Sequence, residues 1–265
     1  MSEKKHVLWN ERFPLSNKYD PNWVMDNQMG PNVLCLTEWL AENMQLKPGM
    51  RVLDLGCGKA MSSIMLAREF GVEVWAADLW IDANSNWKRI REAGLENQVY
   101  PLHFDAHELP FAEDFFDAIV SLDSYHYFGT DLMYLNNLLR VLKNGCQIGI
   151  VVPALTREFE NNVVPEHLGR EDESGEVWWR PADCASIRTL AWWEQAWGLT
   201  QLVDIETADM LENGAQMWAE FLEALDAAGK NMFPNETRPV REDQGRYLGF
   251  VRLIGRKQGQ ISKRM

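Results

Sequence analysis

Short apolar runs alternate with amphipathic or polar stretches through the first half of the chain. The apolar runs predict strands at 50–55, 72–78, 98–102, 116–122 and 146–152. The intervening stretches predict helices at 22–29, 32–46, 60–70, 84–93 and 130–142. Because these strands are too apolar to leave one face in water, the pattern predicts a parallel sheet with helices on both faces.

The alternation stops at 153–182, where prolines, acids and the pair Trp178-Trp179 occur without a clear period. A long segment of this kind inside a compact domain is often a lid or a binding loop. We therefore expect 153–182 to be an insertion that forms a lid over the active site.

Beyond the insertion the pattern becomes regular again. A helix is expected at 183–197, capped by Asp183 or Ser186 and stopped by Gly198. The remaining elements are expected as strand, helix and strand at 200–206, 212–228 and 246–255. The whole chain, 1–265, then forms one α/β domain with a Rossmann-like, doubly wound sheet of seven strands. We expect the sheet to be mostly parallel with an antiparallel last strand.

Charge and composition restrict the partners. The chain has 39 acidic and 26 basic residues and a formal charge of −13, which repels phosphate backbones and argues against nucleic acid. No apolar run reaches the roughly 20 residues that span a bilayer, and the first residues lack the apolar core of a secretory signal. The four cysteines form no C-x-x-C pair, which favours a reducing cytoplasm over a metal cluster or disulfides. We expect a cytoplasmic protein without a metal, either a monomer or a homodimer.

A glycine-rich turn joins the strand at 50–55 to the helix at 60–70. Gly56 and Gly58 can take positive φ and allow a ligand close to the backbone. With Asp78 at the end of the next strand, this arrangement is typical of a site for a nucleoside-containing cofactor. A dinucleotide fold needs a third glycine for close helix packing, and Met61 occupies that position. This bulky residue counts against a nicotinamide cofactor.

The run Asp54-Leu55-Gly56-Cys57-Gly58-Lys59-Ala60 resembles motif I of the class I S-adenosylmethionine-dependent methyltransferases, with Ala60 in place of the last glycine. Other motifs of that family follow in order. They are Asp78, Asp105-Ala106 before Leu109-Pro110-Phe111, the strand 116–121, and 138–145 with Asn144 where proline is usual. The resemblance covers about residues 30–155. It is strongest to small-molecule enzymes of the ubiquinone/menaquinone-methyltransferase type and to amine-methylating relatives.

The resemblance implies S-adenosyl-L-methionine as the cofactor. The turn would meet its carboxylate, Asp78 its ribose, and Asp105 with Ala106 its adenine. Residues 1–30 would cover the cofactor and the substrate, although an apolar brace is an equal alternative. The cofactor-binding residues are then expected to be Asp54, Gly56, Cys57, Gly58, Asp78, Leu79, Asp105, Ala106, Leu122, Tyr19, Trp23 and Met29.

In the family, the loop after the fourth strand lies near the transferred methyl group. His126 is the candidate catalytic base or orienting group, because the ordinary pKa of histidine is about 6.5, and Tyr125 is placed beside it as a second catalytic candidate. Packing or helix capping by His126 is an equal alternative. The residues expected to contact the acceptor are Asp123, Tyr127, Trp178 and Trp179.

The predicted activity is methyl transfer by in-line displacement to a nitrogen, oxygen, carbon or sulfur atom of a small molecule. Two alternatives stay open. One is a nicotinamide-dependent oxidoreductase on the same architecture, and the other is a module that binds S-adenosylmethionine without catalysis.

Overall fold

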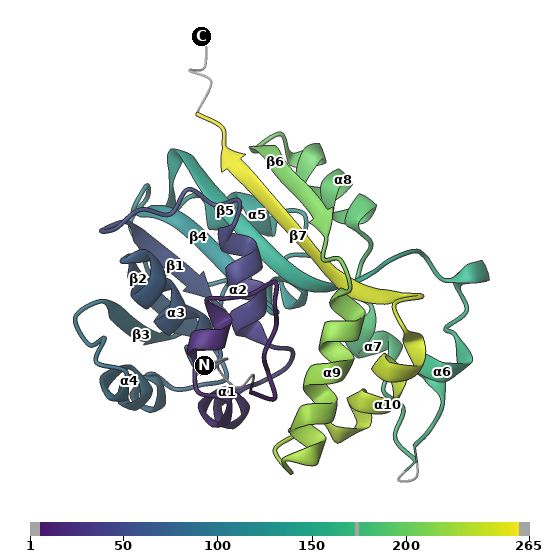
Figure 1. Cartoon of the computed structure of the whole chain (residues 1–265). Coiled ribbons are helices and arrows are strands. Elements are labelled where there is room, and N and C mark those ends of the chain that lie inside the picture. The colour runs from purple at the N-terminus through teal and green to yellow at the C-terminus, as the bar shows by residue number, and fades with distance from the viewer. Residues whose placement is uncertain (1–5, 173–174, 260–265) are drawn as a thin grey trace.

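The computed structural model describes residues 6–172 and 175–259. A mixed sheet of seven strands forms their centre, in the order β3-β2-β1-β4-β5-β7-β6 (Figure 1). Its strands are β1 Arg51–Leu55, β2 Glu73–Asp78, β3 Val99–His103, β4 Phe116–Leu122, β5 Leu142–Leu155, β6 Val203–Met210 and β7 Leu248–Lys257. The first five strands pair in parallel, and β7 runs antiparallel to both β5 and β6. The predicted topology is confirmed.

Helices cover both faces of the sheet, as expected. Val52, Val74 and Val120 point into an apolar cluster with α2 (Val33–Ala41), α3 (Met61–Phe70), α4 (Ala83–Glu92) and α9 (Gly214–Ala227). Leu53 and Ile119 point to the other face, into a cluster with α5 (Tyr134–Leu139) and α8 (Leu190–Thr200). Short elements complete the described chain: η1 Ser16–Lys18, α1 Pro21–Asn27, η2 Tyr125–Tyr127, η3 Glu160–Asn162, α6 Glu166–Gly169, α7 Pro181–Cys184 and α10 Pro234–Asp243. No helix of the described ranges is long and apolar enough to cross a membrane.

The predicted ends of α8 are wrong. The helix starts after Thr189, whose hydroxyl accepts from the Trp192 N–H at 3.3 Å, and it runs through Gly198 to an αL residue, Gln201. Trp193 and Trp197 are fully buried on its inner face. Burial of these rings stabilises the last turn by more than the roughly 1 kcal/mol that an internal glycine costs.

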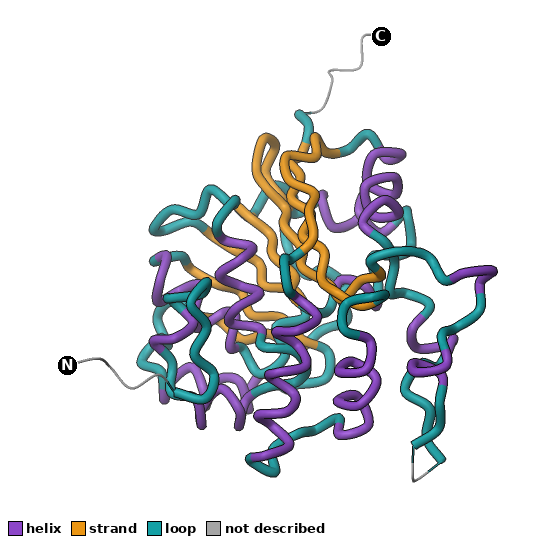
Figure 2. Tube along the Cα trace, turned by 45° about the vertical axis from the view of Figure 1, so that its right-hand side comes forward, coloured by secondary structure: helices purple, strands orange, loops and turns teal. Residues whose placement is uncertain are grey.

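Strand β5 continues to Leu155, and Pro153 pairs with Phe250 of the antiparallel β7. The insertion therefore begins after β5. From here on, "the insertion" means residues 156–189. Figure 2 shows that most of it is loop, with short helical pieces beside α10. Helix α10 was not predicted at all. Its prolines, Pro234 and Pro239, and its high polarity hide the helical pattern.

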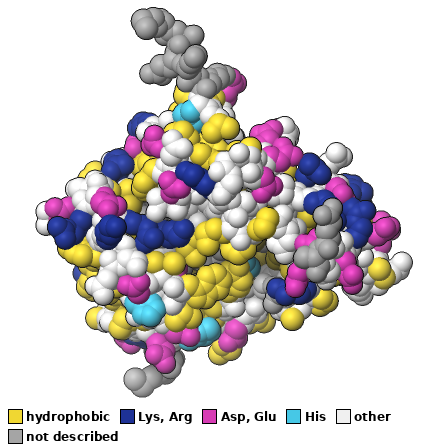
Figure 3. All heavy atoms as spheres, turned by 90° about the horizontal axis from the view of Figure 1, so that it is seen from below, with side chains coloured by type: hydrophobic (Ala, Val, Ile, Leu, Met, Phe, Trp, Pro, Cys, Tyr) yellow, Lys and Arg dark blue, Asp and Glu magenta, His cyan; other side chains and the backbone are white. Residues whose placement is uncertain are grey.

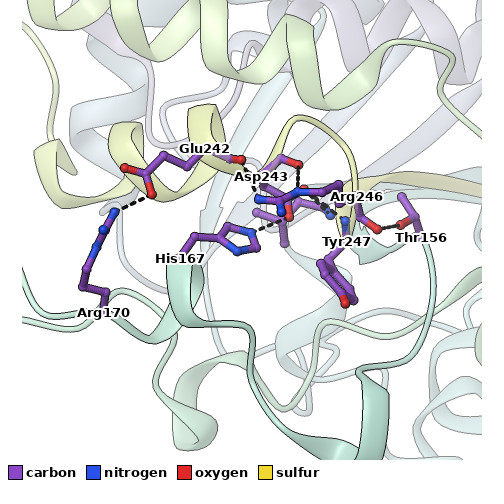
Figure 4. Close-up of polar contacts among 8 residues, drawn as sticks. Thr156, His167, Arg170, Glu242, Asp243, Arg246 and Tyr247 are labelled. Atoms are coloured by element: carbon purple, nitrogen blue, oxygen red, sulfur yellow. Dashed lines mark hydrogen bonds and ion pairs between the residues drawn. The ribbon is translucent and has the colours of Figure 1, made fainter.

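A polar network fastens the insertion to the end of α10 (Figure 4). The fully buried Asp243 accepts from the backbone N–H groups of Tyr247 at 3.1 Å and Leu248 at 2.9 Å. Its other oxygen lies 2.8 Å from Nε2 of His167 on α6. The next residue, Glu242, forms an ion pair with Arg170 at 2.5 Å. Because His167 and Arg170 both belong to the insertion, these contacts fix α10 relative to it.

Candidate active site

A cavity of about 250 Å³ opens where β1, β2 and β4 end. Its walls come from residues 27, 29–31, 33, 55–59, 61, 77–80, 104–107, 122–124, 127 and 128. The exposed side chains of Leu79, Trp80 and Tyr127 lie along it, and the rings of Trp80 and Tyr127 are 5.5 Å apart. Figure 3 shows apolar side chains gathered in the middle of the lower face of the molecule. In open α/β sheets, ligands bind outside the carboxyl ends of the strands, as at this cavity.

The glycine turn forms one wall of the cavity. The N–H groups of Gly56 and Cys57 both donate to the Ala77 carbonyl, at 2.8 and 3.0 Å, which holds the turn against β2. Gly56 has φ +76, and a Cβ atom there would lie 2.2 Å from Oγ of the buried Ser124. Only glycine fits both the backbone conformation and the space. Burial raises the pKa of the Cys57 thiol well above its ordinary value, so this cysteine is a neutral lining group.

Asp78 connects the turn to the loop after β2. Its Oδ2 accepts from the Gly58 N–H at 2.8 Å, and Oδ1 accepts from the N–H groups of Trp80 and Ile81 at 2.7 and 2.9 Å. A carboxylate has about four acceptor positions. Asp78, which lines the cavity, can therefore still accept a hydrogen bond from a ligand hydroxyl.

Asp54 lies behind the turn and is not among the lining residues. Its Oδ2 accepts from the hydroxyls of Ser62 and Ser63, at 2.6 Å each, while the fully buried Oδ1 has no hydrogen-bond partner in the described part of the chain. Burial raises the pKa of Asp54 to about 6 despite the two hydroxyls, which lower it. The position of Asp54 fits a role in organising the turn and the first residues of α3.

Two side chains that the sequence did not single out also shape this wall. Asn86 on α4 donates to the Gly58 carbonyl at 2.9 Å. Lys59 lines the cavity and donates to the carbonyls of Asp26 and Gln28, at 3.3 and 3.4 Å. Lys59 thus ties the N-terminal segment to the turn. The signal for it in the sequence is a lysine beside Ala60 in the middle of the glycine motif.

The loop after β3 forms the opposite wall. Asp105 and Ala106 both line the cavity, as does His107. Asp105 is half-exposed and accepts from the N–H of His107 at 2.9 Å and from its ring Nδ1 at 2.7 Å. These two bonds lower the pKa of Asp105, the backbone bond most, so it is a stable acceptor at neutral pH.

Only part of the predicted N-terminal cover lines the cavity. Met29 and Gly30 line the cavity, and a Cβ atom on Gly58 would lie 3.1 Å from the Met29 sulfur. Tyr19 and Trp23 do not line it. Their rings stack on each other at 5.7 Å, and Arg68 lies over Tyr19. This is the arrangement expected of an apolar brace.

The two predicted catalytic residues are buried and do not line the cavity. Loop residues 122–124, 127 and 128 line it, which includes Leu122, Asp123 and Tyr127, but Tyr125 and His126 do not. Tyr125 is fully buried, and its ring centroid lies 5.8 and 6.0 Å from the ring centroids of Trp193 and Trp197. A 3₁₀ turn has three residues per turn, and here it directs 125 and 126 inward while Tyr127 is 58% exposed.

Burial also removes the basicity expected of His126. The side chain is 4% exposed, its Nδ1 has no hydrogen-bond partner among the described residues, and burial lowers its pKa to about 3. A base of that strength takes a proton poorly near neutrality. The packing alternative describes His126 better than the catalytic one.

Trp178 and Trp179 do not line the cavity, and neither does any other described residue of 153–182. The ring centroids of Trp179 and Phe159 are 4.8 Å apart, and those of Trp178 and Trp218 are 6.2 Å apart. The described part of the predicted lid therefore packs against α9 through Trp178 and contributes no part of the cavity wall.

Two acidic residues, Asp123 and Glu236, have raised pKa values that the sequence did not predict. Asp123 lines the cavity in an αL conformation, and Glu236 comes from α10. Burial, and then the nearby Glu236 charge, raise the pKa of Asp123 well above its ordinary value. Burial raises the pKa of Glu236 to about 7, and a hydrogen bond from Trp178 opposes this. Glu236 gave no signal in the sequence because its helix was not recognised.

The chain is similar to known methyltransferases. Residues 52–145 match a family described as "Methyltransferase domain". A 116-residue segment is 33% identical to methyltransferase GfsG of Streptomyces halstedii, over 43% of this chain and 42% of that protein. A 120-residue segment is 33% identical to demethylmenaquinone methyltransferase of Listeria welshimeri, over 43% of this chain and 50% of that protein. The chain thus spans about half the length of these relatives.

Among solved structures, one from Galdieria sulphuraria, assigned as a sarcosine dimethylglycine methyltransferase, has a TM-score of 0.71 and 18% identity. The match covers 97% of this chain and 94% of that one. At this identity the likeness shows the fold. Residues 52–145 therefore match a methyltransferase domain, and the sheet that contains them has a Rossmann-like methyltransferase fold.

Proposed function

We propose that the protein binds S-adenosylmethionine in the cavity and transfers its methyl group to a small-molecule acceptor. The observation that carries the proposal is the convergence of the glycine turn, Asp78 and Asp105 on one cavity within a methyltransferase domain. The acceptor atom is a nitrogen, oxygen, carbon or sulfur nucleophile.

The lining residues fit the parts of this cofactor. The start of α3 offers N–H groups for the carboxylate, and Asp78 has acceptor capacity for the ribose hydroxyls. Asp105 and Ala106 can meet the polar edge of the adenine, with Leu79 as an apolar neighbour. Asp54 supports this arrangement from behind, through the two serines of α3.

Methyl transfer from a sulfonium needs no protein nucleophile. The bound cofactor supplies an electrophilic methyl group on a sulfonium. The protein then has to align the acceptor atom with it, exclude water and remove a proton where the acceptor carries one. Met29, Leu122 and Tyr127 provide apolar surface along the cavity. Asp123 is the lining carboxylate nearest in sequence to the end of β4, where the resembled fold holds the methyl group.

Two other observations bear on alternatives and on location. Met61 lines the cavity at the position where dinucleotide folds need a glycine, which counts against a nicotinamide cofactor. All four cysteines are unpaired thiols, which supports a reducing compartment, and we infer a cytoplasmic protein.

The test is a transfer assay with methyl-labelled S-adenosylmethionine and pools of amines, phenols, hydroquinones and thiols. We expect label in at least one pool and none without protein. Binding of the cofactor with no transfer to any pool supports the non-catalytic module. Binding of NADH in place of S-adenosylmethionine supports the oxidoreductase.

A further inference from the structure

Two side chains of α4, one turn apart, join the glycine turn to the N-terminal segment. Asn86 is fully buried, its NH₂ group donates to the Gly58 carbonyl at 2.9 Å, and its Oδ1 accepts from Nη1 of Arg89 at 3.2 Å. Nε of Arg89 donates at 3.0 Å to Oδ1 of Asn27, the last residue of α1. We call this series of hydrogen bonds the Arg89 link, and it runs through Gly58, Asn86, Arg89 and Asn27.

Both ends of the Arg89 link line the cavity, and its two middle residues do not. Gly58 and Asn27 are lining residues, whereas Asn86 and Arg89 are not. The N–H group of Gly58 also donates to Oδ2 of Asp78 at 2.8 Å. Gly58 is therefore held on one side by the carboxylate proposed to meet the ribose and on the other by the Arg89 link. The link thus reaches the wall at which the cofactor is proposed to bind.

At its other end the Arg89 link orients Asn27. The NH₂ group of Asn27 donates to the Trp23 carbonyl within α1 at 2.9 Å, and its oxygen accepts from Arg89. Because both polar groups of the amide have a partner, the direction of this side chain is fixed. The lining residues 29–31 follow Asn27 closely in the chain. Fixing Asn27 therefore limits where this part of the N-terminal segment can lie.

A second contact between the same two segments runs through Lys59. Its ammonium group donates to the carbonyls of Asp26 and Gln28 at 3.3 and 3.4 Å, which is longer than the 3.0 Å bond from Arg89 to Asn27. Two separate contacts thus place the N-terminal segment against the glycine turn. The Arg89 link is the better one to perturb, because Lys59 itself lines the cavity and its substitution would change the wall.

An arginine suits position 89 because of its shape as well as its charge. Its guanidinium group is planar and holds its N–H donors in a rigid fork. Here Nε and Nη1 donate to amide oxygens of two different residues, Asn27 and Asn86. Lysine keeps the charge, but its donors are on one nitrogen atom without the fork. An arginine-to-lysine change therefore separates the geometry of the link from its charge.

We propose that Arg89 is a positioning residue for the cofactor site, which acts by holding residues 27–31 against the cavity when S-adenosylmethionine occupies the glycine turn. The inference rests on the proposed function and adds to it a residue of α4 that does not line the cavity. Coupling between two parts of a site is reciprocal. The Arg89 link therefore raises the affinity for the cofactor, and the bound cofactor in turn keeps the N-terminal segment in place.

The first measurement is calorimetric titration of the full chain with S-adenosylhomocysteine, the demethylated form of the cofactor. The variants are Arg89→Gln, Asn27→Ala and the two combined, and the control is Arg91→Gln, at an exposed position of the same helix. We expect each single variant to bind about tenfold more weakly. The combined variant should lose no more than the weaker single variant, because both changes remove the same link. The control should match the wild type.

Two further readouts distinguish positioning from charge and from general stability. Arg89→Lys should recover at most a small part of the lost affinity. In hydrogen exchange, S-adenosylhomocysteine should protect the amides of residues 21–33 in the wild type and in Arg91→Gln, and much less in Arg89→Gln. Exchange in β4 without ligand should be equal in all of them, as the check that the fold is unchanged. Asn27→Ala leaves α4 unaltered and carries the same test should Arg89→Gln fail this check.

Unchanged affinity in Arg89→Gln, full recovery in Arg89→Lys, or losses that multiply in the combined variant would each overturn this inference and leave the proposed function intact. Equal protection of residues 21–33 in the wild type and in Arg89→Gln would do the same. Absence of any S-adenosylhomocysteine or S-adenosylmethionine binding to the wild type is instead the failure of the proposed function, and the inference fails with it.

Discussion

Asp243 offers a quantitative test of how the insertion and α10 are held together. The change Asp243→Ala removes the acceptor for two buried backbone N–H groups, on Tyr247 and Leu248, and the partner of His167. Each buried donor left unpaired costs about 1–3 kcal/mol. We therefore expect the free energy of unfolding to fall by about 2–5 kcal/mol.

The neighbouring Glu242 is the matched control. It belongs to the same helix and the same network, but its ion pair with Arg170 is 31% and 45% exposed. Exposed pairs contribute about 0–1 kcal/mol, so Glu242→Gln should change the free energy of unfolding by less than about 1 kcal/mol.

Asp243→Asn should fall between them, at less than about 1.5 kcal/mol. Its amide oxygen can accept from both backbone N–H groups, and its NH₂ group can still face Nε2 of His167. Urea unfolding at pH 8 measures all three variants, with equal m-values as the check that the unfolding transition is unchanged. Equal losses in Asp243→Ala and Glu242→Gln would refute the reasoning, because the buried acceptor would then contribute no more than an exposed ion pair.

Three further predictions concern the turn and the carboxylates around it. Gly56→Ala should lower the free energy of unfolding by about 2–4 kcal/mol, because residue 56 has positive φ and a Cβ atom there would contact Ser124. The control is Gly49→Ala, at a residue with φ +80 and no neighbour within 4 Å. It should lower the free energy of unfolding by only about 1–2 kcal/mol in the same urea experiment. Asp54 has its pKa raised to about 6 from an ordinary 3.8, so the native state keeps a proton that the unfolded state has lost. Stability should therefore fall as pH rises from about 4 to about 6, by up to about 3 kcal/mol, and Asp54→Asn should remove that part of the decline; parallel pH curves for the two proteins would contradict this. Asp78→Ala removes an acceptor from three N–H groups of the lining loops and should weaken S-adenosylmethionine binding at least about tenfold by calorimetry; unchanged affinity would mean that the ribose contact is misplaced.

The sheet and the glycine-turn wall of the cavity could be predicted from the sequence because both depend on local patterns. Buried parallel strands are apolar throughout, as 116–122 shows, and a glycine in αL conformation ends a helix, as Gly71 does for α3. The turn around Gly56 combines positive φ with a close neighbour, which few residue types allow. Such signals are contained in a few consecutive residues, so no knowledge of the distant chain is needed.

The surroundings of the loop after β4 depend on distant contacts, and the sequence did not reveal them. His126 follows a strand and has a suitable side chain, but the 3₁₀ turn directs it inward. Glu236 belongs to α10, which is fastened to the insertion through Asp243, and its charge contributes to the raised pKa of Asp123. Helix α10 contains Pro239 and is polar, and tertiary contacts rather than propensity hold it.

The central claim is that the cavity at the ends of β1 and β2 is an S-adenosylmethionine site. The most direct measurement is calorimetric titration of the full chain with S-adenosylmethionine and, separately, with NADH. We expect saturable binding of S-adenosylmethionine at one site, weakened by Asp78→Ala, and no binding of NADH. Binding of NADH without binding of S-adenosylmethionine would contradict it.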